Sequence, residues 1–201
     1  GKHLPAVLMA FALIVVALAW GGIAVIVDHE RERRIADAKV DNANLARVLE
    51  EHTARSLNYV DQLSLLIKRG YEKDGKALDL AGLFGSMQVS RELVLDATIA
   101  NERGDVVKTS RKVFSPNNLS DREHFQAHVA DDSGKLVIGK PVLGRISKAW
   151  TLVATRRINK PGGTFGGTVN VLIDPFYFTN LYKGVDLGRH QAFLGGTVGN
   201  A

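Results

Sequence analysis

The chain has 201 residues, of which 45% are hydrophobic and 23% charged, and these proportions exclude wholesale disorder and a multi-span membrane protein. Lys and Arg number 26 against 21 Asp and Glu, giving a formal net charge of +5. Nucleic-acid binding is not expected, because no cluster of basic residues with interleaved aromatic residues is present. The absence of cysteine excludes disulfide scaffolds, thiolate zinc sites and cysteine nucleophiles.

The first predicted element is a transmembrane helix within residues 1–27. Leu4 to Val27 has no charged side chain, and as a helix rising about 1.5 Å per residue it would cross a hydrocarbon core of about 30 Å. A cleaved signal peptide would have a shorter apolar region that ends in small residues. Here the charged segment DHERERR follows directly.

The charges flanking this span do not fix its orientation. Arg31, Arg33 and Arg34 follow the span, and by the positive-inside rule they favour a cytoplasmic C-terminal side. The chain begins with Gly1, so we expect part of the N-terminal flank to be absent, and acidic residues lie between the arginines. Both orientations stay open on charge alone.

A long helix is predicted over residues 28–72, ending near Gly70, since neither Pro nor Gly interrupts the segment before that residue. One face carries residues at alternating three- and four-residue steps. They are Ile35, Ala38, Asn42, Leu45, Leu49, His52, Ser56, Val60, Leu63 and Ile67. The semi-polar first half predicts a stalk, which could pair with a second copy, and the apolar second half predicts packing against a domain.

Residues 73–184 are predicted to form that domain. After a polar turn and a short helix within 77–87, strands are expected at 92–100 and 106–110, joined by the turn NERGD. A loop and a short helix capped by Ser120 or Asp121 follow, then strands at 136–142, 149–158 and 166–173 and a final helix from Asp174. This order predicts an α+β fold, with a five-stranded antiparallel sheet whose helices lie on one side.

Residues 185–201 contain strand-like and turn-like pieces but are too few for another domain. We therefore expect a second, membrane-proximal lobe to begin there, and the chain to be truncated at both ends.

Several segments together resemble the extracytoplasmic double-Cache, or PAS-like, sensor region of bacterial diguanylate cyclases and sensor histidine kinases. They are the apolar span, the long helix, SDREHFQAH, AWTLVATRRI, PGGTFGG and DPFYF. The resemblance covers about Asp28 to Gly188. It implies a PAS-like lobe that senses a small solute, such as an organic acid, and passes the change along the long helix.

The resemblance also implies a location and partners. The lobe would face the periplasm from the bacterial inner membrane, and the chain would form a homodimer through the long helix. This chain would not be an enzyme itself, and an enzymatic output domain would follow it. Cyclase, kinase and chemoreceptor outputs all stay open.

In the family, ligands lie between the sheet and the loop and helix after the second strand. This implies a site at Arg122, His124, Phe125 and the neighbouring His128. Arg122 could bind a carboxylate through two parallel hydrogen bonds, or it could only pair with Asp121 or Glu123, and both interpretations stay open. Family members that bind amino acids have aromatic residues where His124 and Phe125 stand, so His124 does not support an amino-acid ligand.

Further candidate ligand contacts are Trp150, Arg156, Asp174 and Tyr177. Trp150 and Phe125 are also expected core residues, because each is the apolar member of an amphipathic element. Arg156 ends its strand where the family also has Arg. It could reach the rim of the pocket or lie in solvent. Asp174 is expected to cap the last helix first and to contact ligand second.

Other functions find little support in the residues. His124 and His128 have the i, i+4 spacing of two metal ligands, but no HExxH pattern surrounds them, and neither a metal nor a cofactor is expected. GGTFGG lacks the Lys-Ser/Thr ending of a phosphate-binding loop. A pilin-like structural subunit is the alternative; pilins resemble one another in a Glu near the start of the apolar segment, which Leu4 to Val27 lacks.

Overall fold

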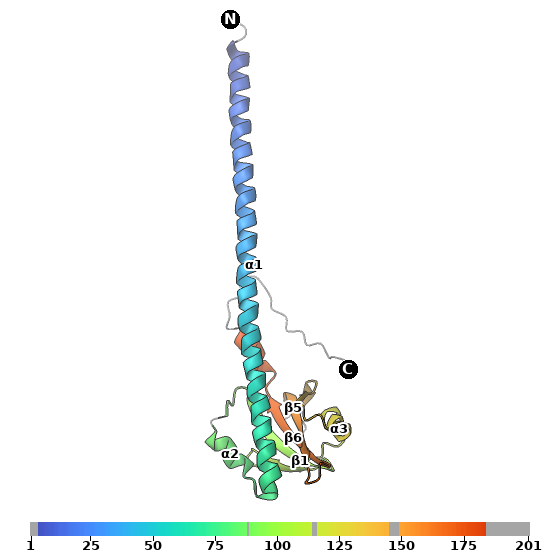
Figure 1. Cartoon of the computed structure of the whole chain (residues 1–201). Coiled ribbons are helices and arrows are strands. Elements are labelled where there is room, and N and C mark those ends of the chain that lie inside the picture. The colour runs from blue at the N-terminus through green and yellow to red at the C-terminus, as the bar shows by residue number, and fades with distance from the viewer. Residues whose placement is uncertain (1–3, 88, 114–115, 145–148, 184–201) are drawn as a thin grey trace. The chain divides into compact units, whose positions relative to one another are not determined.

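The computed structural model describes residues 4–87, 89–113, 116–144 and 149–183 of the chain (Figure 1). It divides into two compact units, with the boundary between Glu51 and His52. The first helix, α1 (Leu4–Asp74), runs through this boundary. Residues 185–201, where we expected a second lobe to begin, lie outside the described part.

In the first unit, α1 contains a stretch that is long and apolar enough to cross a membrane. Its most apolar window of 18 residues has a mean hydropathy of 2.4, and none of that window is buried within the protein. Described side chains from Phe11 to Val27 are exposed, Leu18 and Val25 each by 71%. By length and composition, this stretch is able to cross a lipid bilayer.

In the second unit, α1 packs against a sheet with the apolar half of the predicted stripe. Val60, Leu63 and Ile67 are each at most 2% exposed and belong to the core cluster. The prediction that the helix ends at Gly70 was wrong, because α1 continues to Asp74. A Cβ atom at Gly70 would lie 3.2 Å from a methyl group of Leu78, so the glycine allows that side chain to pack closely on the helix.

The sheet is antiparallel and has six strands, of which five follow the order β2-β1-β6-β5-β3, while β4 also pairs with β5. The strands are β1 (Val94–Asn101), β2 (Val106–Thr109), β3 (Val137–Ile138), β4 (Val142–Leu143), β5 (Trp150–Asn159) and β6 (Phe165–Ile173). The α+β class and the antiparallel sheet are confirmed. The single strand predicted at 136–142 was wrong: it is the two short strands β3 and β4, which pair with different parts of β5.

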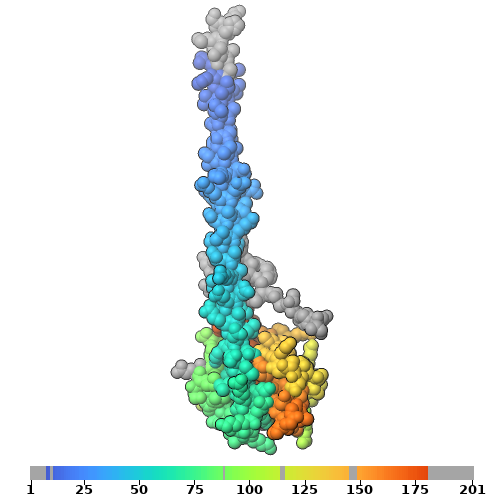
Figure 2. Space-filling model, in the orientation of Figure 1, coloured from blue at the N-terminus to red at the C-terminus, as the bar shows by residue number. Residues whose placement is uncertain are grey.

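Four short helical segments accompany the sheet: η1 (Gly75–Ala77), α2 (Leu80–Ser86), α3 (Glu123–Ala130) and α4 (Phe176–Lys183). Within the second unit, Figure 2 shows the part of α1 after Glu51 in front, with α2 in green on one side and α3 in yellow on the other. The predicted cap of α3 was wrong. Arg122 occupies the cap position, and its carbonyl oxygen accepts hydrogen bonds from the backbone N–H groups of Phe125 and Gln126.

Side chains alternate between the two faces of the central strands, as the period of two requires. Ala97, Ile99, Ala154, Val169 and Val171 face the core shared with α1 and α2. The intervening residues face the opposite side, where the Thr155 hydroxyl and the His128 ring of α3 form a hydrogen bond. The helices therefore lie on both faces of the sheet, and the expectation that they lie on one side was wrong.

Candidate functional site: a charged cavity on the sheet

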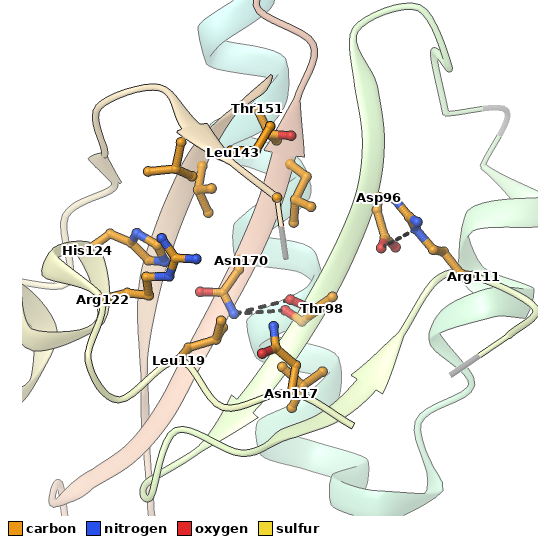
Figure 3. A pocket seen from close by; sticks show the side chains of 15 residues that line it. Asp96, Thr98, Arg111, Asn117, Leu119, Arg122, His124, Leu143, Thr151 and Asn170 are labelled. Atoms are coloured by element: carbon orange, nitrogen blue, oxygen red, sulfur yellow. Dashed lines mark hydrogen bonds and ion pairs between the residues drawn. The ribbon is translucent and has the colours of Figure 1, made fainter. Parts of the chain in front are cut away.

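A cavity of about 80 Å³ lies on the face of the sheet opposite α1 (Figure 3). Because a single water needs roughly 10–15 Å³ of such space, the cavity suits a small solute. Its described walls come from β1, β2, β4, β5 and β6, from Arg111, from the segment 116–122 and from the start of α3. The lining residues are Asp96, Thr98, Val106, Arg111, Asn117, Leu119, Arg122, His124, Val142, Leu143, Gly144, Thr151, Val153, Asn170 and Leu172.

The floor of the cavity is polar because the central strands place polar side chains there. Asn170 of β6 is 1% exposed, and its amide nitrogen donates to the carbonyl and hydroxyl oxygens of Thr98 on β1 at 3.4 and 3.3 Å. The Thr168 hydroxyl donates to the Asn170 side-chain oxygen at 3.1 Å. These bonds fix the Asn170 amide, so the floor is pre-organised.

The segment before α3 is held against the turn between β1 and β2. The Asn118 side-chain nitrogen donates to an Asp105 carboxylate oxygen at 2.8 Å and to the Arg103 carbonyl oxygen at 3.0 Å. Gly104, with φ of +84°, passes so close to Ser120 that a Cβ atom would lie 2.5 Å from its backbone nitrogen. This contact positions the segment that leads to Arg122.

Arg122 and His124 line one side of the cavity together (Figure 3). Arg122 is partly buried, and within the described part of the chain its guanidinium makes neither a hydrogen bond nor an ion pair. His124 is 7% exposed. Burial, reinforced by the nearby Arg122 and His128, lowers the pKa of His124 from 6.5 to about 4, so its imidazole is neutral at pH 7.

The depressed pKa values of the two α3 histidines predict a loss of stability in acid. Burial also lowers the pKa of His128, whose ring bonds Thr155. In the unfolded chain each imidazole takes up a proton as the pH falls below about 6.5, whereas folded His124 stays neutral down to about 4. The two histidines therefore cost no stability above about pH 6.5. Below that value, each lowers the free energy of unfolding by up to about 1.4 kcal/mol per pH unit.

Unfolding curves at pH 7.5, 5.5 and 4.5 check this expectation, with His124→Gln as the comparison. The variant should show a shallower decline, because its side chain does not titrate. An equal slope in the two proteins would show that His124 is not the cause.

Asp96 and Arg111 lie on the other side of the cavity and form an ion pair (Figure 3). The Arg111 Nε atom is 2.7 Å from an Asp96 carboxylate oxygen, and Asp96 is 3% exposed. The same carboxylate accepts hydrogen bonds from the hydroxyl groups of Ser110 at 2.5 Å and Thr109 at 3.2 Å. Asp96 is thus fully engaged by its neighbours.

Of the predicted site residues, the structure brings Arg122 and His124 into this cavity. Phe125 is instead buried on the α3 side of the sheet, outside the core cluster shared with α1. It is 2% exposed, and its ring meets Phe165 edge-on at 5.4 Å between centroids. Trp150 lies outside the core, with 54% exposure at the start of β5, and does not line the cavity.

The other three predicted residues also lie elsewhere. Arg156 projects from the opposite face of β5, where its guanidinium is ion-paired with Asp61 and bonded to the Ser64 hydroxyl, both on α1. Asp174 and Tyr177 border a separate cavity near α4. Asp174 lies two residues before the start of α4, and its carboxylate accepts a hydrogen bond from the Phe176 N–H at 2.8 Å.

Sequence reasoning missed several polar residues of the cavity, namely Asp96, Thr98, Arg111, Asn117, Thr151 and Asn170. Polar residues stand at alternate positions in two central strands, Asp96 and Thr98 in β1 and Thr168 and Asn170 in β6. A polar residue at every second position of a buried strand indicates a face that is not packed as core. That signal was available in the sequence.

Within the described residues, no group of three or more His, Asp or Glu side chains could hold a metal ion.

No protein-family model and no curated protein matches the sequence. Among solved structures, the chain is similar to the extracellular domain of a protein assigned as the histidine kinase rpHK1S-Z16, with 27% identity and a TM-score of 0.65 over 72% of this chain and 61% of that one. The ligand-binding domain of Mlp24 with asparagine matches with 16% identity and a TM-score of 0.56, over 74% and 61%. An extracellular ligand-binding receptor from Desulfohalobium retbaense matches with 19% identity and a TM-score of 0.52, over 66% and 26%.

The chain spans less than two thirds of the length of each of these structures. All three are described as extracellular or ligand-binding domains, and none is described as a catalytic domain. The resemblance to double-Cache sensor regions is thereby confirmed, and the chain has the fold of extracellular sensor and ligand-binding domains.

Proposed function

We propose that this chain is the extracytoplasmic input region of a bacterial transmembrane signalling protein, of the histidine kinase or diguanylate cyclase type. Its lobe lies in the periplasm, anchored in the inner membrane by the apolar stretch of α1, and binds a small solute in the cavity. The similarity to the rpHK1S-Z16 extracellular domain supports the sensing role.

The observation that carries solute binding is the guanidinium of Arg122 at the cavity wall, which has no hydrogen-bond or ion-pair partner among the described residues. A partly buried cation without a protein partner is costly unless a ligand or water compensates it. A carboxylate can do so through two parallel N–H···O bonds. His124 is neutral and Arg111 is already paired with Asp96, so the described lining residues carry a net charge of about one positive unit, which favours an organic acid.

Transmission to α1 is supported by the contacts on the opposite face of β5. Val153 and Thr151 line the cavity, and Arg156 of the same strand binds Asp61 and Ser64 of α1. A solute that binds one arrangement of β5 and α1 more tightly than another shifts the equilibrium between them. Shifts of about 1–2 Å between helices are enough in known switches.

A ligand screen with the full chain in lipid nanodiscs tests the proposal. Thermal unfolding is followed in the presence of organic acids, amines and amino acids, and we expect organic acids to raise the Tm, because ligand at about 100 times its Kd stabilises by about 2.7 kcal/mol. Arg122→Gln should weaken binding roughly 10- to 100-fold, the value of a charge-assisted hydrogen bond.

The matched control is Arg103→Gln, which removes the same charge from an exposed turn outside the cavity. It should bind as the wild-type chain does. Failure of every class of solute to shift the Tm would exclude solute sensing at this cavity.

We also propose that the first half of the stripe pairs with a second copy. Because the chain has no cysteine, single-cysteine variants report contacts cleanly. Ala38 lies on the stripe, whereas Val40 lies on the opposite side of the helix and is 59% exposed. The two variants to compare are Ala38→Cys and Val40→Cys. We expect oxidation to give at least about five times more disulfide-linked dimer with Ala38→Cys. Equal yields from the two positions would contradict pairing through this face.

A further inference from the structure

The three charged side chains that line the cavity differ in whether a neighbour already neutralises them: Asp96 and Arg111 pair with each other, whereas Arg122 has no ion-pair partner among the described residues. Figure 3 shows Arg122 beside His124 on one side, Asp96 with Arg111 on the other, and Asn170 and Thr98 between them. Among the described residues that line the cavity, Asp96 is the sole carboxylate. Arg111, from the same chain, occupies the position that a ligand cation would need.

We propose that Arg111 acts as a built-in counter-ion that makes the cavity select small carboxylic acids without an ammonium group. The inference rests on the proposed solute binding and names the class of solute. It follows from where an ammonium could lie in the cavity.

An ammonium next to the ligand carboxylate would lie near the Arg122 guanidinium and a neutral imidazole. Asp121 and Glu123 are exposed and do not line the cavity, so they offer it no direct partner. An ammonium thus loses its hydration without gaining a carboxylate, which is costly.

An ammonium at the far end of the ligand would lie near Asp96, but other side chains of the protein already bind this carboxylate. It already has the Arg111 ion pair and hydrogen bonds from Ser110 and Thr109. A ligand cation would have to displace Arg111, which is only 35% exposed in its side chain. Rejection of the wrong ligand by a pre-formed internal contact is a recognised source of specificity.

Removal of Arg111 should convert this end of the cavity into an ammonium site. In Arg111→Gln the Asp96 carboxylate keeps its two hydroxyl donors but loses its counter-ion. A ligand with a carboxylate for Arg122 and an ammonium at its other end could then bind both groups. Selectivity should move towards such a ligand roughly 10- to 100-fold, as expected for one charge-assisted contact.

The experiment uses butyrate, 2-aminobutyrate and 4-aminobutyrate, which share one carbon chain and differ in whether and where they carry an ammonium. The corresponding three- and five-carbon sets cover the span of the cavity. Kd values are measured by calorimetry with the full chain in nanodiscs. In the wild-type chain, the acid of the best-fitting length should bind at least about 10-fold more tightly than either amino derivative. In Arg111→Gln, the derivative with the terminal ammonium should gain most.

Two further variants distinguish a change in ligand selectivity from a loss of folding. Arg111→Lys retains a cation and should keep the wild-type preference. The double variant Asp96→Asn, Arg111→Gln has neither charge and should bind neither amino derivative well.

The outcomes separate this inference from the proposed function. If either amino derivative binds the wild-type chain as tightly as the acid, and Arg122→Gln abolishes that binding, the cavity is a solute site but the role of Arg111 is excluded. An unchanged preference in Arg111→Gln excludes it as well. If no acid of the three sets binds, the inferred ligand class is wrong, and the broader screen then decides whether solute sensing itself fails.

Discussion

Replacing Gly167 with alanine is expected to lower the free energy of unfolding by about 3 kcal/mol or more. Gly167 lies in β6 between β1 and β5, with φ of +128°, a conformation that residues with a Cβ atom rarely adopt. A Cβ atom there would overlap with the carbonyl oxygen of Ala100, and that oxygen belongs to backbone that cannot move without disturbing the sheet. Backbone strain and overpacking each cost about 1–3 kcal/mol.

Thermal or urea unfolding followed by circular dichroism measures this effect, and Gly162→Ala is the control. Gly162 also has a positive φ, of +99°, but nothing lies within 4 Å of its added Cβ atom. It should lose only the strain, about 1–2 kcal/mol. Equal losses in the two variants would show that the close approach to Ala100 is not what requires glycine.

Truncation of Phe125 to alanine is expected to destabilise the second unit by about 3–5 kcal/mol, the usual cost of removing a buried aromatic ring. The ring is 2% exposed and contacts Phe165, whose face also receives the Arg157 guanidinium at 5.0 Å. Arg157 in turn donates to the His128 carbonyl oxygen at 2.6 Å, so the ring lies in the contact that holds α3 on the sheet.

Val129→Ala is the control for this variant, since Val129 is on the same helix and 46% exposed. Its loss should stay below about 0.5 kcal/mol. A small effect of Phe125→Ala would indicate that α3 is held mainly by its polar contacts.

Much of the fold could be predicted because local patterns and tertiary packing agree. The apolar steps at Val60, Leu63 and Ile67 place these residues in the core, as the structure confirms. The predicted helix end at Gly70 was wrong because glycine, which often ends helices, here makes room for Leu78 inside the helix. No local pattern reveals a neighbour eight residues away.

The candidate site was harder to predict because its residues come together only through strand pairing. Thr98 lies opposite Asn170 across β1 and β6, although 72 residues separate them in the chain. Arg156 shows the opposite problem. The prediction treated it as a pocket or solvent residue, but the alternation that points Thr155 to α3 necessarily points Arg156 to α1. Its partner Asp61 carries no sequence signal of this role.

The sheet is a single layer. The same strands therefore line the cavity on one face and pack against α1 on the other. Val153 and Ala154 are consecutive residues, one lining the cavity and the other packed in the core. Such a wall cannot be remodelled without its reverse side being altered too. Substitutions at the periphery of the cavity, in the segment 116–122 and in β4, would therefore change ligand preference with the least effect on stability. Variants of the central strands would alter affinity and thermal stability together.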